Sequence, residues 1–232
     1  MGHMTSAVSI MCVLPDLLGT YGDAGNQIAL VHRLRARDIP VEVVRVEPGD
    51  PVPTSGDIYL LGGGEDRAQA LATELIGGSL AHAVDDGATV FGVCAGLQIM
   101  GRSFTDSSGA TYRGLGLLDV VTEPLARRAV GEAVIECDLP GVGRIVGFEN
   151  HRGGTRLSAG ALPLGTVASG VGNGLTAGTE GAWSGRVLGT YLHGPVLALN
   201  PALADQILGW TVGELAPIDD GLAQRARSLR AP

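Results

Sequence analysis

The sequence contains no lysine, and all 16 basic residues among its 232 are arginines. Chemistry that depends on a lysine amine, such as Schiff-base catalysis or the phosphate grip of a P-loop, is therefore excluded. The 24 acidic residues outnumber the arginines and give a net charge of −8. This charge argues against nucleic acid or an anionic membrane as the main partner.

Cysteine is also scarce. Cys12, Cys94 and Cys137 have neither paired nor metal-like spacing, so we expect no disulfide framework, no metal site and a reducing cytoplasm. No signal peptide is recognised, and no apolar run is long enough to span a bilayer. Residues 1–4 look like an expression scar, and we expect residues 5–232 to form one domain.

Short apolar runs alternate with helical patterns in the first half of the chain. We expect strands over 8–14, 41–46, 57–61 and 89–93, and helices over 27–37 and about 67–84. This alternation predicts an α/β fold with a doubly wound, mostly parallel sheet, whose sites lie at the carboxyl ends of strands.

The second half of the chain has a different pattern. Short, often β-branched stretches separated by glycines predict a mixed or antiparallel extension, at 115–122, 131–135, 144–148 and 166–168. A closing strand over 186–192 is followed by a helix from Pro201 to about Val212 with Asn200 as its cap. The arginine-rich stretch 224–230 predicts a solvated helix.

Cys94 ends a buried strand and lies between Gly92 and Gly96. This spacing is typical of a nucleophile elbow, in which small neighbours allow a tight strand-to-helix turn. The amino end of the following helix would favour the thiolate and receive a developing oxyanion. The alternative is a buried structural cysteine, which the two flanking glycines disfavour.

The triple glycine at 62–64 follows another strand. It matches no phosphate-binding pattern, because neither a GxGxxG nor a Walker sequence surrounds it. It could instead present backbone N–H groups to a reacting carbonyl, together with the N–H of Ala95. A plain tight turn is the alternative.

His193 follows the closing strand, so it should lie at the same edge of the sheet as Cys94. It could take the thiol proton and return it to a leaving group. His151 and His32 are expected to be structural or exposed.

These residues resemble a known family. Residues 91–98 are similar to the nucleophile motif of class I, triad-type glutamine amidotransferase domains, 62–64 to their oxyanion loop and 191–194 to their histidine strand. The sequence Gly-Phe-Glu-Asn-His at 147–151 resembles the cobyric-acid-synthase-like branch. The stretch 15–26 is most similar to GatD-type subunits of lipid II isoglutaminyl synthases.

The resemblance implies a flavodoxin-like fold and a glutaminase without a cofactor. Cys94 would attack the side-chain amide of L-glutamine, and water would hydrolyse the resulting thioester. The released ammonia would pass to a Mur-ligase-like, MurT-type partner that carries the ATP and lipid II sites. That partner would amidate the α-carboxyl of D-glutamate to D-isoglutamine in peptidoglycan synthesis.

The same resemblance implies a set of glutamine contacts. Arg128 would bind the α-carboxylate, with Arg127 as the competing assignment, because a planar guanidinium grips two oxygens. Further substrate contacts are implied at Gly63, Gly64, Ala95 and Gln98.

One departure from the family pattern concerns the third catalytic group. Triad amidotransferases carry His-x-Glu, whereas Gly194 and Pro195 follow His193. Glu149, Asp16 or a residue of the partner could orient the imidazole instead. Without such an acid, the isolated chain is expected to be a poor glutaminase.

Rival functions remain open on the sequence. A stand-alone cysteine hydrolase would use the same thiol and histidine, and would release a cleaved product. A cobyric-acid-type amidotransferase of cofactor biosynthesis would normally carry its synthetase half on the same chain. A non-catalytic binding module would not need an intact thiol and histidine.

Overall fold

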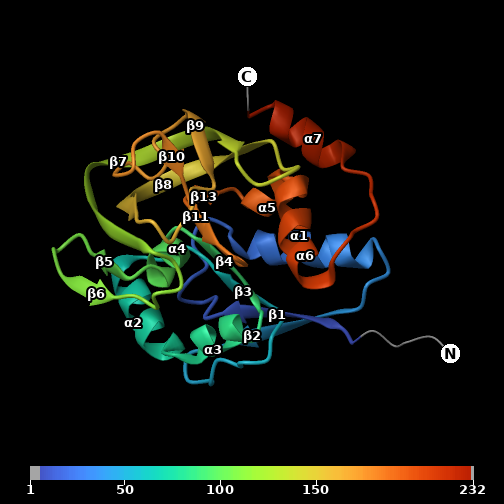
Figure 1. The fold of residues 1–232 in the computed structure, drawn as a ribbon, viewed down its shortest axis with the longest axis horizontal. Helices are drawn as coiled ribbons and strands as arrows, with labels where there is room; N and C mark the ends of the chain where they lie inside the picture. The colour runs from blue at the N-terminus through green and yellow to red at the C-terminus, as the bar shows by residue number, and fades with distance from the viewer. Residues whose placement is uncertain (1–5, 231–232) are drawn as a thin grey trace.

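A six-stranded sheet runs through the middle of the molecule in the computed structural model, which describes residues 6–230 (Figure 1). Its strands follow the order β11-β12-β4-β3-β1-β2, and only β11 is antiparallel to its neighbour. Their bounds are β1 Val8–Val13, β2 Val41–Val46, β3 Ile58–Leu61, β4 Thr89–Val93, β11 Ala182–Ser184 and β12 Val187–Thr190. The predicted doubly wound sheet is confirmed.

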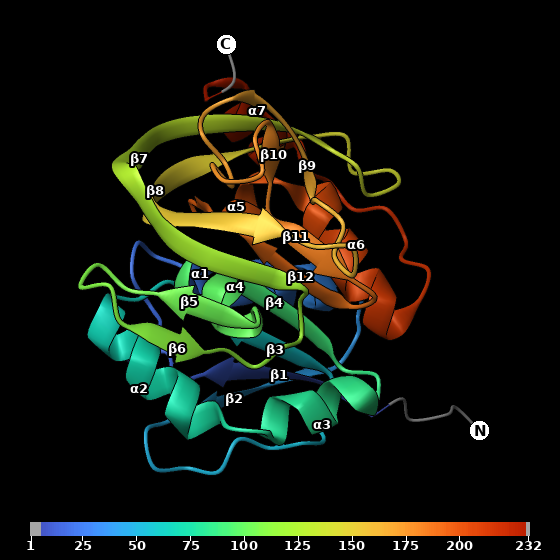
Figure 2. The ribbon, with the colours of Figure 1, turned by 60° about the vertical axis from the view of Figure 1, so that its left-hand side comes forward.

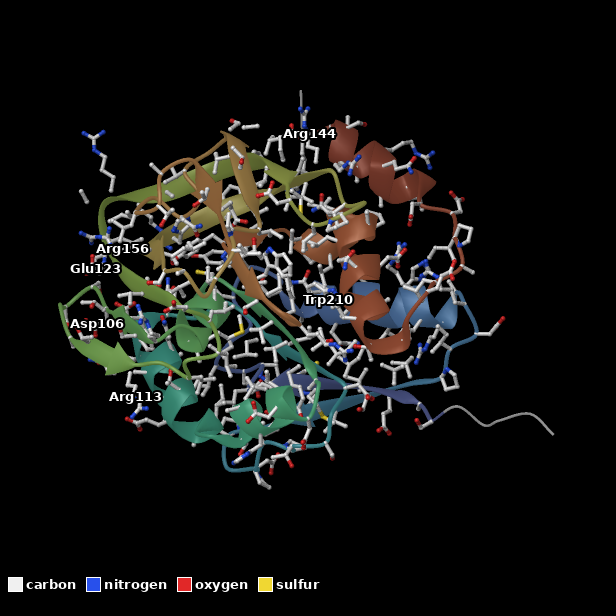
Figure 3. The ribbon with its side chains drawn as sticks, viewed as in Figure 1. Asp106, Arg113, Glu123, Arg144, Arg156 and Trp210 are labelled. Atoms are coloured by element: carbon white, nitrogen blue, oxygen red, sulfur yellow. The ribbon has the colours of Figure 1, made fainter. Side chains whose placement is uncertain are left out.

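Helices cover both faces of this sheet, and a separate hydrophobic core fills each face. Figure 2 shows α2 (Asp66–Ile76) and α3 (Ser79–Asp85) on the side away from α6 (Pro201–Val212). The opposite core holds α1 (Ala24–Arg35), α5 (Val196–Leu199) and α6. Trp210 of α6 stacks on a second tryptophan, Trp183, with ring centroids 6.4 Å apart (Figure 3).

The predicted helix over 67–84 is wrong in one respect, because the chain forms two helices there. Gly77 ends α2 in a left-handed conformation with a φ of +53°. This conformation suits glycine, and it turns the chain before α3 begins at Ser79. In α1, Leu30, Val31 and Leu34 are buried, but Ile28 is exposed.

A second sheet lies beside the first and contains the predicted mixed extension. Its order is β10-β9-β7-β5-β6, with β8 pairing with both β7 and β13. The strands are β5 Ser103–Thr105, β6 Thr111–Arg113, β7 Val120–Cys137, β8 Arg144–Leu157, β9 Gly165–Ser169, β10 Thr179–Glu180 and β13 Leu192–His193. β7 and β8 are far longer than the predicted stretches, and a register shift between Pro124 and Ala129 interrupts their pairing. Figure 2 shows this pair arching over the first sheet.

The predicted closing strand divides between the two sheets. β12 pairs with β4, whereas β13 pairs with β8. Between them, the backbone N–H of Tyr191 donates to the buried Glu180 carboxylate at 2.6 Å. This change of sheet delivers His193 to the junction of the two layers.

Three features concern the carboxyl-terminal region. Asn200 precedes α6 as predicted, but its side chain bonds to the backbone of Val146 and Val196 and does not cap the helix. α7 (Gly221–Ser228) buries none of its residues, so the predicted solvated helix is confirmed. Within residues 6–230, no helix combines the length and apolarity needed to cross a bilayer.

Candidate active site

Cys94 forms the turn between β4 and α4 (Ala95–Met100). Its φ of +53° is rare for a non-glycine residue and marks a strained elbow. Its N–H donates to the carbonyl of Thr190 at 2.8 Å, which fixes the turn to β12. A Cβ at Gly96 would lie 2.6 Å from the Leu61 carbonyl oxygen, so only glycine allows α4 to start so close to β3.

The imidazole of His193 is buried and held by an acid. Its Nδ1 lies 3.0 Å and 3.1 Å from the two carboxylate oxygens of Asp23, so Nδ1 carries the proton and donates. The Nε2 atom is buried and has no hydrogen-bond partner within the described residues. Asp23 also accepts the N–H of Gly63 at 2.8 Å, which fixes its carboxylate.

Gly63 is the point at which these three side chains converge. A Cβ placed on Gly63 would lie 2.8 Å from His193 Cε1, 3.2 Å from Asp23 Oδ2 and 3.6 Å from Cys94 Cβ. A side chain at this position would displace the imidazole. The side chains of Cys94, His193 and Asp23 therefore lie close together at the carboxyl edge of the central sheet.

A pocket of about 280 Å³ opens above Cys94. Its wall contains Arg128, whose Nε donates to Asn150 Oδ1 at 2.6 Å and whose Nη2 donates to the Tyr21 hydroxyl at 3.2 Å. Arg128 lies in the register shift of β7, where the chain bulges away from regular pairing. The other lining residues are Gly64, Glu65, Asp66, Gln69, Gln98, Thr105, Ser107, Pro124, His151, Arg152 and Gly153.

The chain is similar to several known proteins. Residues 9–201 match the CobB/CobQ-like glutamine amidotransferase domain. The subunit GatD of lipid II isoglutaminyl synthase (glutamine-hydrolyzing) from Staphylococcus aureus is 40% identical over 205 residues, which cover 87% of this chain and 83% of that protein. The cobyric acid synthase of Methylobacterium nodulans is 38% identical over 162 residues, 66% of this chain but only 32% of that protein.

A crystal structure of a glutamine amidotransferase shares the fold, with a TM-score of 0.61 at 22% identity over 88% of this chain and 99% of that one. The match to the amidotransferase domain spans most of the chain. The chain belongs to the CobB/CobQ-like glutamine amidotransferase family. It is a glutamine-hydrolysing enzyme with the fold of that family.

The pKa of the Cys94 thiol in this amidotransferase is higher than the sequence analysis expects. Burial, followed by the Asp23 charge, raises the pKa of Cys94 to about 12, although the Ala95 N–H and the Arg128 charge act in the opposite direction. The helix terminus therefore does not outweigh the loss of solvent. The shift favours the protonated thiol in the substrate-free enzyme.

Neither predicted orienting acid contacts His193. Asp16 is exposed and pairs with Arg45 at 3.1 Å. Glu149 is buried, but its carboxylate accepts the N–H groups of Val171 and Gly172. The acid beside the imidazole is Asp23, which the sequence reasoning missed although it lies in the connection that follows β1 at the same sheet edge.

The remaining residues predicted to contact glutamine lie in different positions relative to the pocket. Gly64 and Gln98 line the pocket with Arg128, whereas Arg127 is exposed and does not line it. The N–H of Gly63 faces Asp23. Gln98 is fixed by Gln69, whose Nε2 donates to Gln98 Oε1 at 2.9 Å.

His151 and His32 lie where the sequence analysis expected them. His151 stacks on Tyr191 with centroids 3.8 Å apart and also lines the pocket, and His32 is exposed on α1. Tyr21 and Asn150 contact Arg128 but were not predicted as site residues. Tyr21 lies within residues 15–26 and Asn150 within residues 147–151, two stretches on which the family resemblance rests. This resemblance was the signal that could have identified them.

Proposed function

We propose that Cys94 is the nucleophile of glutamine hydrolysis, that His193 is its general base, and that Asp23 orients the base. The convergence of all three side chains around Gly63 carries this proposal. The raised pKa of Cys94 supports it as well, because a protonated thiol needs a base within reach. The free Nε2 of His193 is the atom that can serve.

The reaction then follows from these positions. Nε2 of His193 takes the thiol proton while Sγ of Cys94 attacks the carboxamide carbon of glutamine. The tetrahedral intermediate collapses, the C–N bond breaks, and the imidazolium returns the proton to the departing ammonia. A water molecule, deprotonated by Nε2, then cleaves the thioester to give glutamate and the free thiol.

Backbone N–H groups stabilise the oxyanion in this proposal. The N–H of Ala95 points toward the Cys94 sulfur at the start of α4. Because the N–H of Gly63 is bonded to Asp23, we assign the second donor to Gly64. Arg128 binds the α-carboxylate of glutamine on the opposite wall of the pocket, and Gln98 closes its buried end.

We further propose that the ammonia is delivered to a Mur-ligase-like synthetase subunit that activates the acceptor with ATP. The support is the 40% identity with a GatD subunit over 83% of its length. The acceptor would be the α-carboxyl of D-glutamate in lipid II. The reaction would take place in the cytoplasm, where free thiols such as those of Cys12, Cys94 and Cys137 stay reduced.

A glutamine-analogue electrophile such as 6-diazo-5-oxo-L-norleucine tests the nucleophile assignment. We expect one adduct per chain, at Cys94, as located by peptide mass spectrometry. Cys12 and Cys137 do not line the pocket that would hold the glutamine analogue, so the same reagent should spare both. An adduct that persists in Cys94→Ser would contradict the assignment.

Cobyric acid synthesis is the second candidate for the use of the ammonia. A GatD subunit matches 87% of this chain at 40% identity and a cobyric acid synthase matches 66% at 38%, so the peptidoglycan reaction is favoured. Co-purification from the native cell distinguishes the two candidates. Recovery of a Mur-ligase-like chain supports the peptidoglycan reaction, and recovery of a cobyrinate-binding synthetase contradicts it.

A further inference from the structure

Tyr21 occupies an unusual position between the substrate pocket and the histidine. Its φ of +61° is rare for a bulky residue, and the residue as a whole is 44% exposed. The ring meets His193 edge-on, with centroids 5.0 Å apart and planes at 64°. Strained residues of this kind cluster at functional sites, which directs attention to what the conformation achieves.

The tyrosine hydroxyl reaches the other side of the pocket. It accepts a hydrogen bond from Nη2 of Arg128 at 3.2 Å, while Nε of Arg128 donates to Asn150 Oδ1. A guanidinium has five N–H donors in a fixed plane. Nη2 also donates to the Asn150 carbonyl at 3.5 Å, so Nη1 is the nitrogen left for a carboxylate.

The β1–α1 connection, which contains Tyr21, also holds the imidazole of His193 from a second side. Tyr21 lies two residues before Asp23, whose carboxylate bonds to Nδ1 of His193. The connection is tied to the glycine loop, because the N–H of Thr20 donates to the carbonyl of Gly63 at 3.1 Å. One short segment therefore contacts both the substrate-binding arginine and the base.

We propose that Tyr21 is a positioning residue that couples recognition of the glutamine α-carboxylate to the placement of His193; this rests on the proposed function of the pocket. Its hydroxyl holds Arg128 in the orientation that reads the carboxylate. Its ring covers the imidazole and keeps water from it. The two parts of the side chain therefore have separable effects on binding and on turnover.

Calorimetry in a Cys94→Ser background, in which no turnover occurs, tests the hydroxyl. Two ligands are compared: L-glutamine and 4-aminobutanamide, which lacks only the α-carboxylate. Tyr21→Phe should raise the Kd of glutamine by about two- to tenfold, the loss expected for one hydrogen bond, and leave that of 4-aminobutanamide unchanged. In an Arg128→Ala background, Tyr21→Phe should have no further effect on glutamine.

Steady-state glutamate release by the full chain tests the ring. Tyr21→Phe should keep kcat within about twofold of the wild type, since the ring remains. Tyr21→Ala should lower kcat in addition to raising KM. Tyr112→Phe is the matched control, because its hydroxyl contacts Asp106 on the β5–β6 hairpin, and neither constant should change.

Several results would overturn the proposal. These are an unchanged glutamine Kd in Tyr21→Phe, an equal loss for both ligands, or an effect of Tyr21→Phe that persists without Arg128. A kcat in Tyr21→Ala equal to that of Tyr21→Phe would overturn the role of the ring. Failure of the Cys94→Ser protein to bind glutamine at all would instead contradict the proposed function of the pocket.

Discussion

The tautomer of His193 is set by a residue 170 positions away in the sequence. Because Asp23 accepts from Nδ1, the lone pair of the imidazole lies on Nε2, the atom required of the proposed base. When the imidazole becomes protonated, the same carboxylate stabilises the charge. In the proposed mechanism, Asp23 supplies what the glutamate of His-x-Glu supplies in other triad enzymes.

Asp23→Asn should keep the shape of the site and lose its charge. The amide can hold the imidazole in the wrong tautomer, and in a worked triad this change costs about 10⁴-fold in turnover. We expect kcat for glutamine hydrolysis to fall by about 10²- to 10⁴-fold with little change in the glutamine Kd. Asp16→Asn is the control, because that carboxylate is exposed and pairs only with Arg45. A larger loss in Asp16→Asn than in Asp23→Asn would contradict the assignment.

Adjacent arginines allow a matched test of substrate recognition. Arg128→Ala should weaken glutamine binding by roughly 1.5–3 kcal/mol, the contribution of hydrogen bonds to a charged group. Arg127→Ala should leave the Kd unchanged, since Arg127 does not line the pocket. Calorimetry on the two variants in a Cys94→Ser background measures both values. The reverse order would transfer the carboxylate-binding role to Arg127.

At the scale of elements, the sequence predicts strands that end in glycine-framed turns. It does not predict contacts between connections that are far apart along the chain. Cys94 is marked by Gly92 and Gly96 on either side, and these local signals survive in the fold. Asp23 and His193 meet only because the ends of β1 and β13 come together across two sheets, and no local pattern encodes that pairing.

The long β7–β8 pair was missed for a different physical reason. β7 alternates only in part between buried and exposed positions, and a register shift breaks its periodicity at Arg128. A periodicity of two therefore identifies only the ends of the strand. Arg128, the proposed carboxylate-binding residue, lies at the irregularity that hides the strand from sequence analysis.

The strand junction beside the site depends on a buried acid, Glu180. Its Oε1 accepts from the Thr190 hydroxyl at 3.0 Å and from the Tyr191 N–H, while Oε2 has no partner in the described chain. Burial is the main cause that raises the pKa of Glu180 from 4.5 to about 7. The neutral acid is thus the form that fits the fold.

This pKa shift predicts a pH-dependent loss of stability. Below about pH 4.5 both the folded and the unfolded chain carry the Glu180 proton. As the pH rises to 7, the unfolded chain releases the proton first, so the contribution of this group to the free energy of unfolding falls by about 3 kcal/mol. Glu180→Gln removes this dependence.

Urea unfolding at pH 5 and at pH 8 measures the effect. The stability of Glu180→Gln relative to the wild type should rise between the two pH values. Glu136→Gln is the control, since Glu136 is an exposed partner of Arg144 and its curve should stay parallel to that of the wild type. Parallel curves for Glu180→Gln as well would show that the buried acid is ionised in the folded protein.

At the scale of the whole molecule, each region of the fold supplies one part of the proposed site. The central sheet presents Cys94, the second sheet brings Arg128 and His193, and the β1–α1 connection carries Asp23. The pocket therefore lies where the two sheets meet. Movement of one sheet against the other would change the separation of the thiol from the substrate-binding arginine.

The presence of Asp23 changes the prediction about the partner. The absence of an acid after His193 predicted a poor glutaminase that a synthetase subunit would complete. Because the base and its orienting carboxylate both lie within this chain, the isolated chain should hydrolyse glutamine. We expect its kcat to lie within about tenfold of the value for the complex, since loss of an orienting acid would cost about 10⁴-fold.

The partner should instead decide where the ammonia goes. The test uses glutamine labelled with ¹⁵N at its side-chain amide. The isolated chain should release all of the label to solvent. The complex, supplied with ATP and acceptor, should retain the label in the amidated product even when unlabelled ammonium is present in excess. Glutamate release and the isotope content of the product measure the two parts separately. An isolated chain that is slower by about 10⁴-fold would show that Asp23 does not complete the triad by itself, and Asp23→Asn would then have little further effect on it.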